Sequence, residues 1–336
     1  RKGPHSGLSG IGAADGHLFP RTVPSETFAL TEAMEFSGDV EDLSDLPGVK
    51  VDKHSTGGVG DKTTLVVAPV AAAAGVTVAK MSGRGLGFTG GTADKLEAIP
   101  GFRTGLQPAE FRRQLEELGL AVITQTGSIT PADKKIYALR DVTGTVESPG
   151  LIASSIMSKK LAAGSDGIVL DVKCGSGALL KDLADAENLA DLMIDIGRKA
   201  GRKMVAVISD MNQPLGQTVG NALEVEEAIQ VLKGGGPEDL RQLCLELAGY
   251  MIWIGGRAES FQEGQTPAAR VLADGRALEK FRQMVRYQGG DDRIIEEPER
   301  LGSSRYSRDV FVERDGFVAE MAAQEIGRAS QHLGAG

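Results

Sequence analysis

Two glycine-rich stretches carry most of the residues that could do chemistry. One reads Lys53-His-Ser-Thr-Gly-Gly-Val-Gly-Asp61, the other Ser82-Gly-Arg-Gly-Leu-Gly-Phe-Thr-Gly-Gly-Thr-Ala-Asp-Lys-Leu-Glu97. Each follows a short apolar segment and leads into a helix-like run, so unpaired backbone N–H groups and the positive end of a helix dipole face the loop. Cations and hydroxyls flank both loops: Lys53, Ser55, Thr64, Lys80, Ser82, Arg84 and Thr92. This pattern predicts a site for a small anion, most simply phosphate.

A second group of polar residues lies on two helix-like segments. Thr130-Pro131-Ala-Asp133 predicts a helix start, with threonine as the cap, proline at the first helical position and an acid in the first turn. The next helix starts at Ser148-Pro149 and ends before Gly164. Four of its residues share one face: Ile152, Ser155, Ile156 and Lys159. Branched apolar residues beside a hydroxyl and an ammonium favour a pocket for a flat ring with polar edges.

The elements that position these residues alternate along the chain. Short apolar runs predict strands at 49–51, 76–79, 121–124, 168–172 and 204–208, with strand-like runs again at 310–312 and 317–321. Helical patterns cover 25–35, 108–118, 184–201, 219–233, 237–254 and 266–288, the last split near Gly275. Asp61 and Asp94 are predicted helix caps. The alternation predicts a mostly parallel α/β sheet with helices on both faces, whose ligands lie beyond the carboxyl ends of the strands.

Composition excludes several classes of function. The 336 residues carry a net charge of −9, which disfavours nucleic-acid binding because that binding relies on Lys and Arg. Two cysteines cannot form a disulfide framework, so we expect a reducing, cytoplasmic location. The longest uncharged apolar run, 65–79, is interrupted by Pro69 and Gly75, so no membrane span is expected.

The two glycine-rich stretches resemble the signatures of the thymidine and pyrimidine-nucleoside phosphorylases. The agreement continues through 132–143, 151–163 and 208–216, and it extends from Ser25 to the C-terminus. The resemblance implies a pentosyltransferase that reversibly splits thymidine, uridine or deoxyuridine with phosphate. The products would be the free base and (2-deoxy)ribose 1-phosphate. Phosphate would be a co-substrate, and no cofactor would be required.

The resemblance also implies roles for particular residues. Phosphate would contact Lys53, Ser55, Thr64, Lys80, Ser82 and Thr92. The nucleoside would contact His54, Leu86, Tyr137, Arg140, Ile152, Ser155 and Lys159. Of these, His54, Arg140 and Lys159 would be catalytic: the two cations stabilise negative charge on the leaving pyrimidine, and the histidine donates a proton to it.

The family's fold implies a small all-helical domain, 25–47 and 130–164, hinged to a larger, mostly parallel α/β domain, 48–129 and 165–300. Residues 1–24 would be irregular, and 301–336 would begin an incomplete C-terminal subdomain. By this comparison the chain is expected to be truncated at both ends. A homodimer is expected if the N-terminal helices are present.

Three positions depart from the family pattern. Phe88 stands where histidine is usual, and Leu179 where phenylalanine is common, both near the nucleoside pocket. Bacterial members bind a monovalent cation, which here would meet Gly60, Leu215, Thr218 and Glu227. Lys62 occupies the position of a threonine ligand. We expect its ammonium to pair with Glu227 in place of the cation, which predicts a weakened potassium site.

Other functions remain open alternatives. Gly83-Arg-Gly85 begins like a dinucleotide-binding loop, but the third glycine of that fingerprint would fall at Phe88. A phosphoribosyltransferase of the same fold would need a magnesium-pyrophosphate site, and these loops carry no suitable acidic cluster. A catalytically impaired fragment that still binds phosphate or nucleoside is the third alternative.

Overall fold

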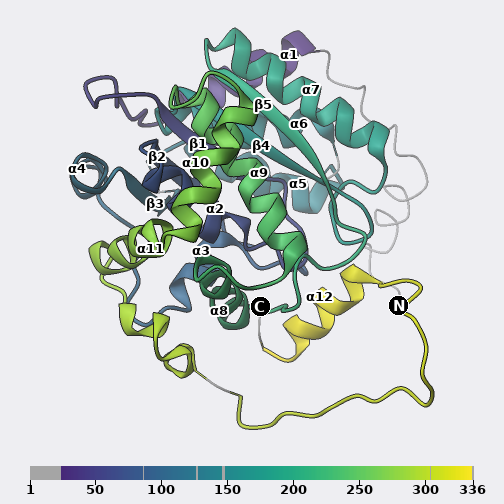
Figure 1. The fold of residues 1–336 in the computed structure, drawn as a ribbon. Helices are drawn as coiled ribbons and strands as arrows, with labels where there is room; N and C mark the ends of the chain where they lie inside the picture. The colour runs from purple at the N-terminus through teal and green to yellow at the C-terminus, as the bar shows by residue number, and fades with distance from the viewer. Residues whose placement is uncertain (1–23, 86, 126–127, 146–147, 303, 335–336) are drawn as a thin grey trace, which may run out of the picture.

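A five-stranded parallel sheet forms the centre of the protein (Figure 1). The computed structural model describes residues 24–85, 87–125, 128–145, 148–302 and 304–334. The strands are β1 (Lys50–Ser55), β2 (Thr77–Ser82), β3 (Leu120–Thr124), β4 (Gly167–Cys174) and β5 (Lys203–Asp210). Their order is β3-β2-β1-β4-β5, so the chain changes direction across the sheet between β1 and β4. Ligands of such sheets bind at this switch point, beyond the carboxyl ends of the strands.

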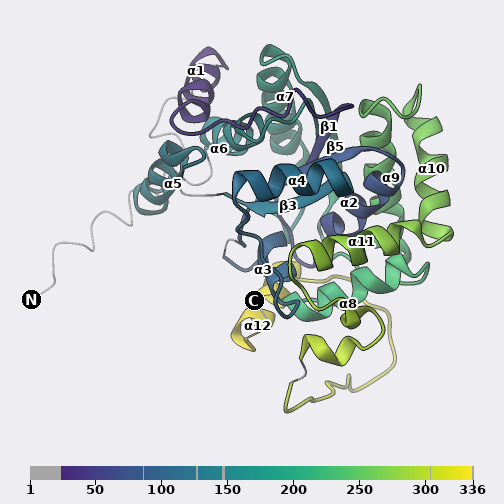
Figure 2. The ribbon, with the colours of Figure 1, turned by 90° about the vertical axis from the view of Figure 1, so that its left-hand side faces the viewer.

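Helices cover both faces of the sheet (Figure 2). One face carries α4 (Pro108–Leu118), α6 (Pro149–Ala162) and α7 (Leu183–Lys199). The other carries α2 (Thr63–Ala73) and α9 (Glu238–Ile254), outside which lie α8 (Asn221–Leu232), α10 (Phe261–Ala273) and α11 (Arg276–Tyr287). Alternate residues of the strands enter the two cores: Val122 packs in the core with α2 and α9, whereas Ile123 packs in the core with α4.

The helices of the predicted helical domain share a core with the sheet. Helices α1 (Pro24–Glu35) and α5 (Pro131–Thr143) pack against α6, and Thr31 Oγ1 donates to Ser154 Oγ at 3.1 Å. On its other side, α6 buries Ile156 and Leu161 in the apolar core that contains Leu170 of β4. Because this core is continuous, the division into two hinged domains remains a prediction.

Three predicted helix caps are wrong in detail. Lys62, not Asp61, precedes α2, although the Asp61 carboxylate accepts from Thr63 N at 3.2 Å. Helix α3 (Thr92–Glu97) begins after Gly91, so Asp94 is its third residue and reaches back to Gly91 N at 3.0 Å. Thr130 adopts a left-handed conformation, with φ +45°, and its side chain does not cap α5. For α2 and α3 the loop fold, rather than residue preference, decides where the helix begins, whereas α5 begins at Pro131 as predicted and lacks only the side-chain cap.

The strands predicted at 310–312 and 317–321 are not present. These segments have no regular secondary structure and no ladder partner among the described residues, and Phe311 and Phe317 are exposed. A strand needs a neighbour to accept its backbone hydrogen bonds, and none lies beside them. After the short helices η1 (Asp292–Ile295) and η2 (Pro298–Leu301), the chain instead ends in α12 (Ala323–His332), which the sequence reading missed. In the described part of the chain, no helix has the length and apolarity to cross a membrane.

Candidate active site

The residues predicted to bind phosphate lie at one edge of the sheet. Lys53 and Ser55 end β1, and Lys80 and Ser82 end β2. Thr64 lies in the first turn of α2, which follows β1, and Thr92 is the first residue of α3, which follows β2. Because β1 and β2 are adjacent and parallel, their carboxyl ends and the two helix N-termini meet at this edge.

A buried cluster of charges fixes the end of β1. Lys53 Nζ lies 3.0 Å from Asp171 Oδ2 and donates to Thr63 Oγ1 at 2.6 Å. Lys173 Nζ lies 2.9 Å from the same Asp171 carboxylate. Burial raises the pKa of the neighbouring Asp61 carboxyl, but lysines including Lys173 and Lys53 outweigh it and hold that pKa well below its usual range. Asp61 is therefore charged, and this cluster has two formal positive and two formal negative charges.

A second buried cluster lies between β1 and β2. Asp52 Oδ1 is 3.5 Å from Lys80 Nζ, and Asp52 Oδ2 is 2.8 Å from Lys160 Nζ of α6. Burial, reinforced by the charges of Lys160 and Lys53, holds the pKa of Lys80 well below its usual range, although Asp52 pulls it upward. The Lys160 side chain is buried, with only 3% of its surface exposed.

The second glycine-rich loop closes on itself through Asp94. The Asp94 carboxylate accepts from Gly85 N at 2.6 Å and from Gly91 N at 3.0 Å. A Cβ on Gly91 would lie 2.3 Å from Gly85 N, so only glycine permits this approach. The Arg84 guanidinium lies 2.8 Å from Asp94 and 2.7 Å from Glu97, so its charge is paired within the loop, and a contact of Arg84 with the anion stays a prediction. Leu86, predicted to contact the nucleoside, lies outside the described residues.

The residues predicted to bind the pyrimidine lie on α5 and α6. Lys159 Nζ lies 2.6 Å from Asp133 Oδ2 and donates to Ser155 Oγ at 2.8 Å. Burial lowers the Lys159 pKa, against the raising effect of Asp133. Sequence reasoning missed Asp133 as a site residue, since its only signal was an acid in the first turn of a helix.

Arg140 is held at the end of α5. Its guanidinium carbon lies 5.4 Å from the centre of the Tyr137 ring, and its Nε and a terminal nitrogen donate to Thr145 O at 3.3 Å and Leu151 O at 3.4 Å. Burial lowers the Arg140 pKa, but a guanidinium stays charged at any neutral pH. The predicted apolar contact Ile152, one turn before Ile156 on α6, is buried.

His54 is close to lysines of both buried clusters, Lys53 in the first and Lys80 and Lys160 in the second. It follows Lys53 on β1, and its side chain is half-buried. Burial and the charges of nearby lysines, chiefly Lys160, Lys80 and Lys159, hold its pKa well below the usual range. The imidazole is therefore neutral at neutral pH until an anion offsets the lysine charges.

The residues of the expected cation site surround an ammonium group. Lys62 Nζ donates to Leu215 O at 3.0 Å and to Thr218 O at 2.9 Å, and it forms an ion pair with Glu227. The Lys62 side chain is fully buried. A Cβ on Gly60 would lie 2.6 Å from Leu215 O, which keeps this turn tight. Because the ammonium already engages these oxygens, the residues present do not fit a potassium ion.

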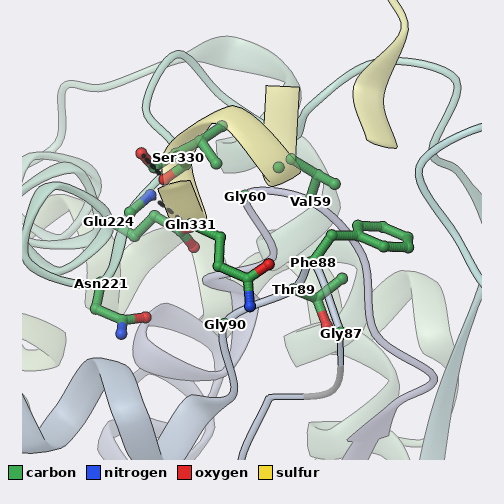
Figure 3. A pocket seen from close by; sticks show the side chains of 13 residues that line it. Val59, Gly60, Gly87, Phe88, Thr89, Gly90, Asn221, Glu224, Ser330 and Gln331 are labelled. Atoms are coloured by element: carbon green, nitrogen blue, oxygen red, sulfur yellow. Dashed lines mark hydrogen bonds between the residues drawn. The ribbon is translucent and has the colours of Figure 1, made fainter. Parts of the chain in front are cut away.

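A small cavity lies behind the second glycine-rich loop (Figure 3). Its walls include Phe88, Asn221 and Gln331, and its volume is about 30 Å³, which suits water rather than a nucleoside. Helix α12 closes it, and Ser330 Oγ donates to Val219 O at 3.0 Å. None of the described residues predicted to bind phosphate or the pyrimidine lines this cavity.

Comparisons with known proteins agree with this arrangement. The model of the glycosyl transferase family, a/b domain, matches residues 48–278. Pyrimidine-nucleoside phosphorylase from Staphylococcus aureus (strain bovine RF122 / ET3-1) is 57% identical over 311 residues, which are 93% of this chain and 72% of that protein. The protein of the same name from strain USA300 gives the same values.

Two solved structures share the fold at low identity. Anthranilate phosphoribosyltransferase from Thermus thermophilus aligns with a TM-score of 0.62 and 22% identity, covering 79% of this chain and 85% of that one. The enzyme of the same name from Saccharomyces cerevisiae, in complex with PRPP and Mg, aligns with a TM-score of 0.60 and 12% identity over 79% of this chain and 80% of that one. At such identities the likeness establishes the fold alone.

Proposed function

This chain belongs to the pyrimidine-nucleoside phosphorylase family, and from that we propose the reaction and the residues that carry it. A pyrimidine nucleoside such as uridine, deoxyuridine or thymidine reacts reversibly with inorganic phosphate. A phosphate oxygen forms a bond to C1′ of the sugar while the bond from C1′ to the base nitrogen breaks. The base leaves with the electron pair and takes up a proton, and the sugar leaves as its 1-phosphate.

We assign the phosphate to the edge formed by β1 and β2. Lys53 and Lys80 supply positive charge there, and Ser55, Ser82 and the first turns of α2 and α3 supply hydroxyl and backbone donors. Thr64 and Thr92 complete the predicted set. These groups hold a dianion without protonating it, which preserves its nucleophilicity. Because they are largely buried, each contact is stronger than it would be in water.

We assign the pyrimidine to α5 and α6. Lys159 and Arg140 stabilise the negative charge that gathers on the ring as it leaves, and Ser155 and Tyr137 orient it. Phosphate binding offsets the lysine charges around His54 and raises its pKa, so the imidazole becomes a proton donor only in the substrate complex. Ile152 offers an apolar surface to the ring.

The ion pair between Lys160 and Asp52 is the observation that supports this assignment most directly. Lys160 follows Lys159 on α6, and Asp52 precedes Lys53 on β1, so their ion pair joins the two elements. The base side and the phosphate side are thereby joined through neighbouring residues. We propose that 25–47 with 130–164 closes on the remaining α/β part to bring sugar and phosphate together, with Lys160 and Asp52 staying paired.

Ultraviolet difference spectroscopy of base release tests the proposal. We expect uridine or thymidine to be cleaved only in the presence of phosphate. Lys159→Ala and Arg140→Ala should each lower kcat/KM for the nucleoside at least about 100-fold, as the loss of a charge-stabilising donor does. Lys134→Ala, a change of a lysine on the exposed side of α5, should have little effect. Phosphate-independent cleavage, or full activity without Lys159 and Arg140, would refute the assignment.

We also propose three further properties of the protein. We propose that activity does not require potassium, since Lys62 occupies the position between Leu215, Thr218 and Glu227. We propose a homodimer if the N-terminal helices of the family are present, which sedimentation would test. We propose a cytoplasmic location, in line with the thiols of Cys174 and Cys244 being unpaired.

A further inference from the structure

Lys160 reaches the gap between β1 and β2, and it is not one of the phosphate contacts assigned above. The β1–β2 ladder joins Lys50 to Thr77 and Val51 to Val78. Beyond that point a side chain replaces the backbone pairing: Asp52 Oδ2 accepts a hydrogen bond from Met81 N at 3.3 Å. Lys160 Nζ then donates both to Asp52 Oδ2 and to Met81 O. A side-chain ion pair from α6 thus bridges the two strands where their ladder has ended.

The two lysines that share Asp52 are not equivalent. Lys160 Nζ lies 2.8 Å from the carboxylate, whereas Lys80 Nζ lies 3.5 Å from it. Asp52 Oδ1, the oxygen on the Lys80 side, accepts no hydrogen bond from the part of the chain that the structure describes. Among the described residues, Asp52 is the one carboxylate within ion-pair distance of either lysine. This cluster therefore has two formal positive charges and one negative, unlike the balanced cluster of Lys53, Lys173, Asp171 and Asp61.

We propose that Lys160 is a positioning residue for phosphate: by holding Asp52 in the gap between β1 and β2, it leaves Lys80 as the cation whose charge is uncompensated at the phosphate site. The proposal rests on the function proposed above, because it takes phosphate as the anion. Lys160 does not contact the substrate. It sets the separation of the two strands that precede the glycine-rich loops. Because Asp52 pairs more closely with Lys160, the charge of Lys80 is the one left uncompensated.

The charges around Lys80 predict that phosphate binding changes its protonation, which can be measured. Burial and the nearby cations Lys160 and Lys53 hold the Lys80 pKa well below its usual range. The other charged or titratable groups facing it are Asp52, which opposes that effect, and His54, which is neutral. A phosphate dianion beside Lys80 raises that pKa again. Phosphate binding is therefore accompanied by proton uptake in the pH range in which Lys80 titrates in the free protein, and below that range Lys80 is a cation before phosphate binds.

Removing the Lys160 ammonium should weaken phosphate binding and reduce the proton uptake that accompanies it. In Lys160→Met the Asp52 carboxylate pairs with Lys80 alone, so the cluster becomes neutral. We expect phosphate to bind at least about tenfold more weakly, because one uncompensated charge in a buried site is lost. Proton uptake in that pH range should become smaller, since the loss of the Lys160 charge raises the pKa of Lys80 in the free protein. Lys160→Arg keeps the charge and should restore both properties.

Lys50→Met provides a matched control. Lys50 also lies on β1, is buried, and pairs with Asp166 at 2.9 Å, but it does so at the opposite end of the strand. We expect this variant to lose stability without a change in phosphate affinity or proton uptake.

Isothermal calorimetry with inorganic phosphate, in two buffers of different ionisation enthalpy, measures affinity and proton uptake together. Unchanged phosphate affinity in Lys160→Met, or a loss matched by Lys50→Met, would overturn the proposal. If Lys160→Met does not fold, Lys80→Met replaces it: proton uptake should vanish there, and its persistence would overturn the proposal. A chain that binds phosphate with proton uptake but cleaves no pyrimidine nucleoside refutes the proposed function and leaves the role of Lys160 supported. Absence of phosphate binding would refute both.

Discussion

Replacing Lys62 tests the buried ion pair that stands in the expected cation site. The Lys62 side chain is fully buried, and its ammonium contacts Leu215 O, Thr218 O and the Glu227 carboxylate. Glu227 also accepts from Gln217 N at 3.0 Å. Lys62→Thr removes the ammonium and leaves two carbonyl oxygens and a buried carboxylate around an empty volume.

The cost of this change follows from the burial of the pair. Removing one partner of a buried ion pair destabilises a protein by about 3–5 kcal/mol. Unfolding entropy is about 2.1 cal/mol/K per residue, so for a chain of 336 residues we expect the Tm to fall by about 4–7 °C. A hydroxyl and the surrounding oxygens then form a set of ligands for a hard monovalent cation. Potassium at about 100 times its Kd would restore roughly 2.7 kcal/mol of stability, which raises the Tm by about 4 °C.

Thermal unfolding at constant ionic strength, in potassium chloride against choline chloride, is the assay. We expect potassium to raise the Tm of Lys62→Thr and to leave the Tm and activity of the unsubstituted chain unchanged. Lys62→Met is the matched control: it loses the same ammonium but offers no hydroxyl ligand, so potassium should restore it less. The reasoning fails if potassium stabilises or activates the unsubstituted chain, or if Lys62→Thr loses no stability in choline chloride.

Three further changes test the loop and the electrostatics. Gly91→Ala places a Cβ 2.3 Å from Gly85 N; we expect overpacking to cost about 1–3 kcal/mol by urea unfolding and kcat/KM for phosphate to fall sharply, whereas Gly105→Ala, where a Cβ meets nothing within 4 Å, should be neutral in both. Asp94→Ala removes the acceptor of Gly85 N and Gly91 N, so the KM for phosphate should rise more than the KM for nucleoside; equal changes would contradict this role. The pKa of His54 is held well below its usual range, so the native state binds fewer protons than the unfolded state, and stability should fall as pH drops below about 6.5, the unfolded histidine value. Urea unfolding across pH should show a shallower slope for His54→Asn, and an unchanged slope would exclude this linkage.

The sequence alone determined the sheet and the loops that follow it. All five strands of the sheet were predicted, because each is a short apolar run bounded by glycine or polar residues. The helix end before Gly164 followed from glycine's access to left-handed backbone conformations, which Gly164 adopts with φ of +77°. The pairing of Lys62 with Glu227 was expected from the family resemblance and is present. The strands predicted at 310–312 and 317–321 failed because an apolar run specifies a strand only where a partner lies beside it.

Only the tertiary structure decided how the charges are paired. Lys160 contacts Asp52 across 108 positions of sequence, and Lys159 contacts Asp133 across 26. On a helix, two consecutive lysines point in different directions, and nothing local reveals that one reaches a gap in the sheet and the other a neighbouring helix. Burial gives these pairs their effect on pKa and on anion binding, since water would screen the same charges at the surface. The residue types therefore predicted a phosphate site, whereas packing between α6 and β1 determined that Lys160, and not Lys159, pairs with Asp52.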